Sequence, residues 1–307
     1  MENKITVTVC GKVMLLGEHS VVYGGLCLAS VVNKYITVTV ARSSTNTDEL
    51  FLPDKTGDQF ILSSLNSFRN SYKTPPLLIR TTSDITGFGL GSSSAVVIGI
   101  VKGISSFLSL NLSDREIFDI SYRAVLGVQK VASGFDIATS LYGGTILFNG
   151  KTKVAEILSK ENLPISVFFS GKKASTVSLV KKVRNVHEKN PQKLKDFFGK
   201  IEECVTDAKI ALIKKDWEKL GMAMNKNHSI LKRMGVSTPY LDCIVQTAQE
   251  RGAYGAKLSG AGGGDCVIVL TPTDQKDKII SSLEAIGVKH LNISVGGSEG
   301  VRISTLL

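Results

Sequence analysis

The sequence predicts an α+β fold, and three observations support that prediction. Residues 4–10 and 26–41 are rich in Val, Ile and Thr, as strands are. Residues 191–251 read as long helices. Residues 256–294 then read as strand, loop, strand, helix and strand, an order that fits an α+β sandwich. A chain of 307 residues is long enough for about two such domains.

The composition is that of a soluble globular protein, with 43% hydrophobic and 21% charged residues. The five cysteines are widely spaced and contain no C-x-x-C pair. We therefore expect free thiols in a reducing cytosol, and neither a disulfide framework nor a zinc site. The sequence has no run of about 18 apolar residues and no signal-peptide pattern. These features predict a cytoplasmic protein that does not span a membrane.

The net charge of +10 raises the question of a nucleic-acid partner. The lysines are spread through predicted helices, however, and no basic run is interleaved with aromatic residues as a stacking platform requires. An anionic small substrate suits the charge equally well. We therefore expect no nucleic acid as partner.

The first half of the chain begins with a strand at residues 4–10, which runs into residues 11–19, a glycine-bounded turn of the kind that holds active sites. Ser113 and Glu116 form a capping box, which starts a helix that ends near residue 128. The other expected elements are one or two strands at 26–41, a hairpin at 48–58, a short helix at 62–72, a strand at 77–82 and a helix at 95–108.

Residues 133–136 are expected in a loop, followed by a short apolar segment to residue 142 and a strand at 144–148. Asn149 and Gly150 suit a tight hairpin turn into a strand at 153–157. We place the boundary between the two domains at this hairpin, which gives domains of residues 1–158 and 159–307.

The second domain is predicted to alternate between helices and strands. Thr238 followed by Pro239 suits the cap and first turn of one of the helices. The expected helices lie at residues 175–188, 191–214, 217–234, 239–251 and 274–286, and the expected strands at 165–169, 256–258, 266–270, 289–294 and 301–304.

Residues 87–95 read Gly-Phe-Gly-Leu-Gly-Ser-Ser-Ser-Ala and predict a phosphate cradle. Glycine tolerates positive φ and lets backbone N–H groups approach a ligand closely. The following helix would direct its unpaired first-turn amides and the positive end of its dipole at the same anion. The serine hydroxyls could cap the helix or coordinate a phosphate-bound Mg²⁺. The alternative is an ordinary turn in which Ser92 is the helix N-cap.

Two common nucleotide motifs are absent. Gly150, Lys151 and Thr152 resemble the end of a Walker A loop, but the preceding Gly144 leaves five intervening residues where that motif has four. No G-x-G-x-x-G follows the first strand, so the sequence does not favour nicotinamide binding.

Two further stretches flank the cradle, namely residues 12–19 and the glycine-rich residues 258–265. Together and in this order, the three stretches resemble the three signature motifs of the GHMP kinases, the small-molecule kinases named for galactose, homoserine, mevalonate and phosphomevalonate. The resemblance covers nearly the whole chain. It implies an N-terminal domain like the second domain of ribosomal protein S5 and a ferredoxin-like C-terminal domain, with ATP and acceptor in the cleft between them.

The resemblance also assigns residues to ATP and Mg²⁺. In such kinases the central loop wraps the ATP phosphates, and the third loop supports that site and the acceptor. Ser93 is the expected Mg²⁺ ligand. The residues so assigned to ATP are Gly87, Gly89, Leu90, Gly91, Ser92, Ser93 and Ser94.

Asp136, in the stretch Ser-Gly-Phe-Asp, corresponds to the catalytic aspartate of the family. A carboxylate beside the acceptor hydroxyl can take its proton as the oxygen attacks the γ-phosphorus, and a neighbouring cation stabilises both charges. Lys12 is the expected cation, and His19 is expected to hydrogen-bond the acceptor. The residues assigned to the acceptor are Glu18, His19, Ser133, Gly260, Ala261 and Gly262.

Within the family, residues 17–24 look like the first motif of the mevalonate kinases, which implies phosphorylation of the 5-hydroxyl of mevalonate. Two features depart from that pattern. The glutamate that helps to hold Mg²⁺ there lies eleven residues before the catalytic aspartate, where this sequence has Val125. Ala174 aligns with a substrate-binding arginine of many mevalonate kinases.

Other stretches leave alternatives open. Residues 133–138, 174–176 and 259–266 look closer to phosphomevalonate kinases, so phosphomevalonate is an alternative acceptor. Lys172 and Lys173 could meet the carboxylate or phosphate of either acceptor. An inactive nucleotide-binding sensor is a remoter alternative. The expected partners are ATP, Mg²⁺ and one of these acceptors, for a monomer or homodimer.

Overall fold

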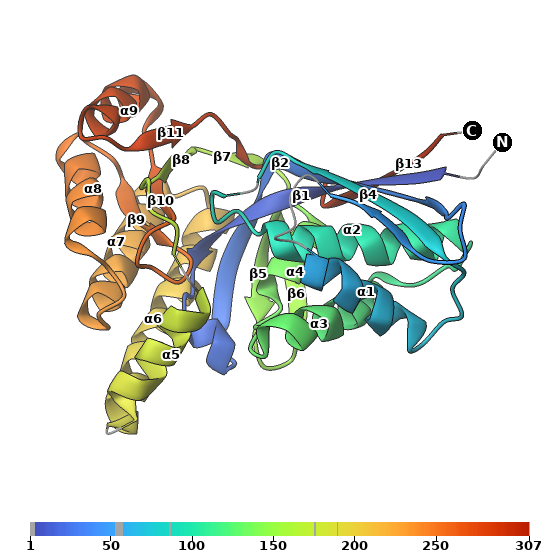
Figure 1. Cartoon of the computed structure of the whole chain (residues 1–307). Helices are drawn as coiled ribbons and strands as arrows, with labels where there is room; N and C mark the ends of the chain where they lie inside the picture. Colours follow the sequence, from blue (N-terminus) through green and yellow to red (C-terminus); the bar gives the residue numbers. More distant parts are fainter. Residues whose placement is uncertain (1–3, 53–57, 86, 175, 189, 307) are drawn as a thin grey trace.

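The computed structural model describes the whole chain except residues 1–3, 53–57, 86, 175, 189 and 307 (Figure 1). The described residues form two sheets, one of nine strands and one of four, with helices packed against both. The predicted α+β class is confirmed. None of the described helices has the length and apolar character that crossing a membrane requires.

The nine-stranded sheet is built around two long antiparallel strands, β1 (Lys4–Leu16) and β2 (Leu26–Arg42). One half of β2 pairs with β4 and the other half with β5. The remaining strands of this sheet are β3 (Glu49–Phe51), β4 (Leu77–Ser83), β5 (Thr145–Asn149), β6 (Val154–Ser159), β7 (Asn162–Leu163), β12 (Val295–Gly296) and β13 (Val301–Leu306).

Four helices cover one face of this sheet: α1 (Asp58–Arg69), α2 (Ser92–Phe107), α3 (Asp114–Gln129) and α4 (Phe135–Tyr142) (Figure 1). Helix α2 lies in the middle and is buried over most of its length. It can approach the sheet closely because two of its residues are glycines, Gly99 and Gly103, which lie against the side chains of Val38 and Val40. This close packing fixes where the N-terminus of α2, and therefore the cradle, lies.

The four-stranded antiparallel sheet has the order β11-β8-β10-β9. Its strands are β8 (Ile165–Phe169), β9 (Gly255–Ser259), β10 (Cys266–Leu270) and β11 (Lys289–Leu291). Helices α7 (Trp217–Arg233), α8 (Pro239–Glu250) and α9 (Lys276–Ala285) pack against it, and α5 (Thr176–His187) and the long α6 (Pro191–Ile213) extend beside it (Figure 1). Two 3-10 turns, η1 (Ser20–Tyr23) and η3 (Thr273–Gln275), complete the described elements.

Predictions that rest on local capping signals are confirmed. The Ser113 side chain and Glu116 form the expected capping box at the start of α3. The Thr238 hydroxyl accepts a hydrogen bond from the Leu241 amide at the start of α8. The hairpin between β5 and β6 is also confirmed, although its turn is longer than predicted, because the Lys153 amide bonds to the Asn149 carbonyl.

Three predictions about elements are wrong, and a fourth lies largely outside the described residues. Strand β1 continues to Leu16, because Gly11 forms only a bulge in its pairing with β2. Most of the second half of the hairpin predicted at residues 48–58 falls on residues 53–57, which lie outside the description, and β3 pairs in parallel with β4. Helix α2 begins at Ser92 and not at residue 95. Asp136 lies in the first turn of α4 and not in a loop.

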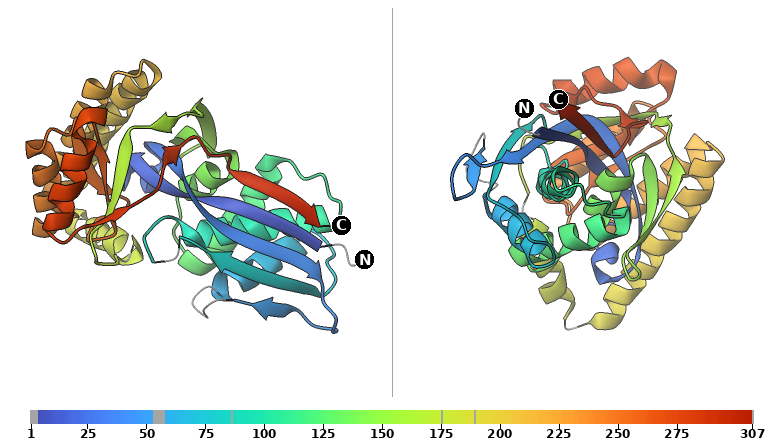
Figure 2. Two further views of the ribbon diagram at one scale, coloured as in Figure 1. Left: turned by 90° about the horizontal axis from the view of Figure 1, so that it is seen from above. Right: turned by 90° about the vertical axis from the view of Figure 1, so that its right-hand side faces the viewer.

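The end of the chain returns to the first sheet. Strand β13 pairs with β1, and β12 pairs with β2 and β7. Figures 1 and 2 show β13 alongside β1, far from the four-stranded sheet. The division at residues 158 and 159 stays a prediction, and the sheets divide the chain differently, because residues 295–306 belong with the N-terminal strands.

Candidate active site

The predicted cradle has the backbone that an anion site requires. Gly87, Gly89 and Gly91 all have positive φ, at 92°, 74° and 82°. Gly91 is the N-cap of α2 and provides no capping side chain, so the amides of the first turn are not capped. The alternative that Ser92 caps the helix is therefore wrong. The free amides and the helix dipole favour an anion at this point.

The cradle packs against two charged side chains. A Cβ added to Gly91 would lie 2.8 Å from Cε of Lys12, and one added to Gly89 would lie 2.8 Å from Cγ of Asp265. A Cβ on Gly87 would meet no atom within 4 Å, so this glycine faces open space. The backbone can lie this close to the Lys12 side chain and the Asp265 carboxylate only because these positions are glycine.

Lys12 and Asp136 meet as predicted. Lys12 lies on β1 and Asp136 in the first turn of α4, and Nζ lies 3.0 Å from Oδ1. The lysine side chain is 10% exposed and the aspartate 33%, so the carboxylate remains accessible to a ligand. The ammonium also lies 5.1 Å from the centre of the Phe135 ring. The Lys12 amide donates to the Leu90 carbonyl at 2.9 Å, which ties the cradle to β1.

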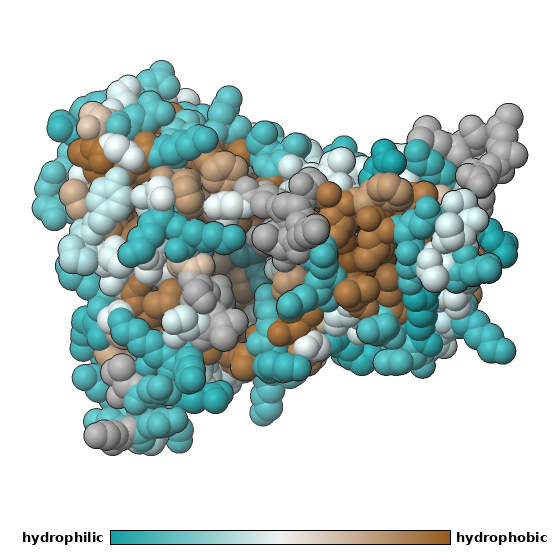
Figure 3. All heavy atoms as spheres, in the orientation of Figure 1, coloured by the Kyte–Doolittle hydropathy of each residue, from teal (hydrophilic) through white to brown (hydrophobic). Residues whose placement is uncertain are grey.

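A cavity of about 390 Å³ joins the cradle to this pair. Figure 3 shows the molecule hollowed between its two halves on this side. The apolar residues that line the cavity are Ile36, Leu52, Phe60, Ile61 and Val96. The polar and small residues that line it are Lys12, Thr81, Ser83, Gly87, Gly89, Gly91, Ser92, Ser93, Gln129, Asp136, Lys173, Ala174, Ser259, Gly260, Ala261 and Asp265.

Glu18 and His19 lie behind the cavity wall and do not line it. The His19 ring is buried, and its Nε2–H donates to the Ala261 carbonyl at 2.9 Å. Burial lowers the pKa of His19. Glu18 is fully buried and forms an ion pair with Lys257 of β9. The structure therefore gives both residues partners within the protein, where the sequence predicted contacts with the acceptor.

The other predicted acceptor residues divide between the cavity and its supports. Gly260 and Ala261 line the cavity. Gly262 does not, because it packs so closely that a Cβ would collide with the Val236 carbonyl. Ser133 is buried, and its carbonyl accepts a hydrogen bond of 2.7 Å from Nζ of Lys153.

Asp265 lines the cavity and was not predicted as a site residue, although it ends the glycine-rich stretch that was. Its Oδ1 accepts a hydrogen bond from the Ala174 amide at 3.1 Å. Burial raises the pKa of Asp265. Of the two adjacent lysines, Lys173 lines the cavity, whereas the Lys172 carbonyl accepts a hydrogen bond from the Asp265 amide.

Gln129 was also missed. Val125, which occupies the position of the expected metal-binding glutamate, is buried in the core. Gln129 lies one turn further along α3 and lines the cavity. The signal that could have found it is the four-residue spacing on a helix, which places both residues on one face. Its side-chain amide offers a neutral oxygen at the cavity, where the family pattern has a carboxylate.

The oxygen donors around the cavity suit a magnesium-bound phosphate. Within the described ranges, no three His, Cys, Asp or Glu side chains gather closely enough to hold a metal ion by themselves. The Ser93 hydroxyl and the Asp136 and Asp265 carboxylates line the cavity instead. Because Mg²⁺ keeps several waters and takes its other ligands from substrate phosphates, such a sparse donor set fits it.

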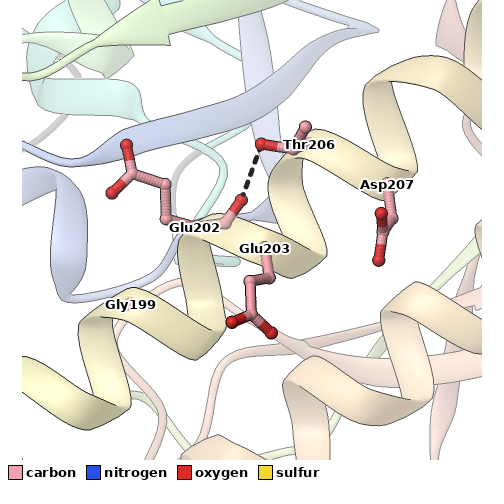
Figure 4. A pocket seen from close by; sticks show the side chains of 5 residues that line it. All are labelled: Gly199, Glu202, Glu203, Thr206 and Asp207. Carbon is pink, nitrogen blue, oxygen red and sulfur yellow. Dashed lines mark hydrogen bonds between the residues drawn. The ribbon is translucent and has the colours of Figure 1, made fainter.

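A second hollow lies along α6 and is lined by Gly199, Glu202, Glu203, Thr206 and Asp207 (Figure 4). Its carboxylates project from a single helix, and Glu203 pairs with Lys226 of α7 at 3.2 Å. None of the predicted site residues lines this hollow, so it is separate from the cavity at the cradle.

Family models match both halves of the chain. The model described as the GHMP kinases N terminal domain matches residues 59–144, and that described as GHMP kinases C terminal matches residues 208–289. Curated relatives include a mevalonate kinase of Thermococcus gammatolerans, 31% identical with 99% of each chain aligned. Another is a mevalonate kinase of Pyrococcus horikoshii, 34% identical with 95% of each chain aligned.

Solved structures also match this chain over nearly its whole length. The structure of L. major mevalonate kinase in complex with R-mevalonate aligns with a TM-score of 0.80 at 26% identity, covering 95% of this chain and 96% of that one. A Streptococcus pneumoniae phosphomevalonate kinase aligns with a TM-score of 0.80 at 19% identity, covering 94% and 99%. At that lower identity the second match shows a shared fold and no more.

Proposed function

The chain belongs to the GHMP kinase family, and we propose that it is a mevalonate kinase that transfers the γ-phosphoryl group of ATP to the 5-hydroxyl of mevalonate. The two-domain GHMP kinase fold expected from the sequence is confirmed. The observation that carries the proposal is the Lys12–Asp136 pair, which lies on the wall of the cavity that the cradle also lines.

The pair has the chemistry that the transfer needs. The partly exposed Asp136 carboxylate can accept the proton of the acceptor hydroxyl as its oxygen attacks the γ-phosphorus. The Lys12 ammonium, 3.0 Å away, stabilises the carboxylate and the developing charge on the attacking oxygen. Since phosphoryl transfer passes through a loose transition state, such positioning and charge stabilisation supply most of the acceleration.

ATP would bind with its phosphates at the cradle and its base against the apolar part of the cavity. The uncapped amides of α2 would hold the phosphates. The side chains of Leu52, Phe60 and Ile61 supply an apolar surface for the base. Ser93 would hold Mg²⁺, which when bound neutralises charge on the phosphates.

The acceptor would lie between Asp136 and the loop that follows β9. Gly260 and Ala261 form that side of the cavity. Lys173 is the exposed cation at the same wall and would meet the carboxylate of mevalonate, where Ala174 replaces the expected arginine. Ser259 and Asp265 complete this wall.

Release of ADP from ATP, measured with each acceptor in turn, tests the proposal. We expect rapid release with mevalonate and only slow release with phosphomevalonate or with no acceptor. Turnover with phosphomevalonate alone would replace the proposal by the second candidate, a phosphomevalonate kinase, which residues 133–138, 174–176 and 259–266 resemble. No turnover with any acceptor, combined with tight ATP binding, would indicate the inactive sensor.

A further inference from the structure

Polar contacts join the end of β1 and the turn after it to β9 and the loop after it. The Met14 amide donates to Oγ of Ser259 at 3.1 Å, and the same hydroxyl donates back to the Met14 carbonyl at 2.9 Å. Two further contacts, between His19 and Ala261 and between Glu18 and Lys257, join the same parts of the chain. We call the six residues that make these contacts the polar seam: Met14, Glu18, His19, Lys257, Ser259 and Ala261.

The further contacts use residues of the turn after β1. Nε2 of His19 donates to the Ala261 carbonyl, as described above. The Lys257 ammonium pairs with Oε1 of Glu18 and also donates to the Leu258 carbonyl at 2.6 Å. Lys257 therefore holds both the turn and the backbone immediately before Ser259.

The polar seam joins two walls of the active-site cavity. Lys12 lies on β1 only two residues before Met14, and its ammonium meets Asp136. On the other side, Ser259 and Ala261 themselves line the cavity. The polar seam thus sets the distance between the strand that carries the catalytic cation and the loop against which the acceptor would lie.

The Glu18–Lys257 ion pair at the centre of the polar seam carries a cost in free energy, because both charges are removed from water. Both side chains of the Glu18–Lys257 pair are completely buried, and Oε2 of Glu18 has no hydrogen-bond partner in the described structure. Burial raises the pKa of Glu18 and lowers that of Lys257, so each group is pushed toward its neutral form despite the other. Buried pairs of this kind often stabilise a fold no more than well-packed neutral side chains do.

The pair instead fixes one arrangement of the two elements that it joins. The carboxylate and the ammonium attract each other in one arrangement, whereas apolar side chains in the same place could slide. We propose that Lys257, acting through Glu18, is a positioning residue that holds residues 259–265 where the acceptor requires them. This inference rests on the proposed function for its kinetic test, although not for its structural one.

The test is the double variant Glu18→Gln/Lys257→Met, which removes both charges at nearly constant side-chain size and leaves no unpaired buried charge. We expect kcat/KM for the acceptor to fall at least about tenfold, while KM for ATP changes less than about twofold and the melting temperature changes by only a few degrees. The matched control is Glu203→Gln/Lys226→Met, which makes the same changes in an exposed pair between α6 and α7. It should leave every value unchanged.

Hydrogen–deuterium exchange provides a readout that needs no activity. Amides of residues 260–264 should exchange faster in the double variant than in the parent, and those of α2 should not. Unchanged exchange with unchanged kcat/KM would overturn the proposal, as would an equal loss for ATP and acceptor. Failure of the double variant to fold would also overturn the proposal, because the ion pair would then be required for folding. If the parent phosphorylates no acceptor, the proposed function fails, and exchange alone decides on the polar seam.

Discussion

Asp136 owes its place to the short helix α4, whose first turn holds it 3.0 Å from the Lys12 ammonium. Because its proposed work concerns the acceptor hydroxyl and not the triphosphate, Asp136→Asn should lower kcat by about 10²- to 10⁴-fold, the usual contribution of a general base. The dissociation constant for ATP should change by less than about threefold. Steady-state kinetics and ATP titration measure the two effects.

The matched control is Asp119→Asn, which neutralises an aspartate of α3 that pairs with Arg115 at the surface. This variant should retain the activity of the parent. If Asp136→Asn instead weakens ATP binding as much as it slows turnover, the carboxylate belongs to the nucleotide site and the assignment is wrong.

The contact between Lys12 and Asp136 was predictable. The resemblance to the GHMP kinases marked Asp136, proton transfer calls for a neighbouring cation, and the structure brings the two side chains together. Their catalytic roles stay a prediction. The surroundings of Glu18 and His19 were not predictable, because their partners lie 239 and 242 residues further along the chain. A buried ion pair between such distant positions leaves no local pattern in the sequence.

At the scale of elements, the cradle depends on glycine at the N-cap of α2. In Gly91→Ala, the new Cβ would strain a backbone at φ 82° and press on Cε of Lys12. The lysine must move to relieve that contact, so we expect a loss in kcat of about tenfold or more as well as weaker ATP binding. This distinguishes the variant from Asp136→Asn, which should affect kcat alone.

Gly235→Ala separates strain from the specific contact. Gly235 also has a positive φ, at 76°, but an added Cβ there would meet no atom within 4 Å. Both variants should lose stability by roughly 1 kcal/mol, since each forces alanine into the left-handed region. Only Gly91→Ala should lose activity. An equal loss of activity in both would show that strain alone explains the effect.

Element boundaries were predictable where a cap or a turn marks them, as at Ser113 and Thr238. The pairing of the strands was not predictable from the sequence. Strand β3 pairs in parallel with β4, across the intervening α1, where a local reading suggested a hairpin. The start of α2 was misplaced because the serines at residues 92–94 resemble loop residues, although glycine provides the cap.

At the scale of the whole molecule, the last described strand, β13, pairs with the first, β1. Strand β13 pairs with β1 from Lys4 opposite Leu306 to Val9 opposite Val301. Sequence order alone places residues 301–306 in the second domain, because a strand carries no local signal of the sheet that it joins. Strand β1, which carries Lys12, therefore pairs with β2 on one edge and with β13, from the other end of the sequence, on the other edge.

Removal of β13 should therefore damage the first sheet and not the second. A variant that ends at Gly300 loses all six pairings with β1, whose residues Val7 and Val9 are fully buried. Loss of a whole strand should lower the melting temperature by on the order of 10 °C, since about 1 kcal/mol corresponds to a few degrees in a protein of this size. Because Lys12 lies on the same strand, ATP-dependent turnover should fall with it. The double substitution Glu299→Ala/Arg302→Ala removes an exposed ion pair and the contact of Arg302 with the Tyr35 ring but keeps the backbone pairing, so it should leave turnover unchanged and lower the melting temperature far less. A variant ending at Gly300 with the parent's melting temperature and turnover would show that β1 needs no partner on this edge, and would favour the division of the chain at residue 158 over the one that the sheets indicate.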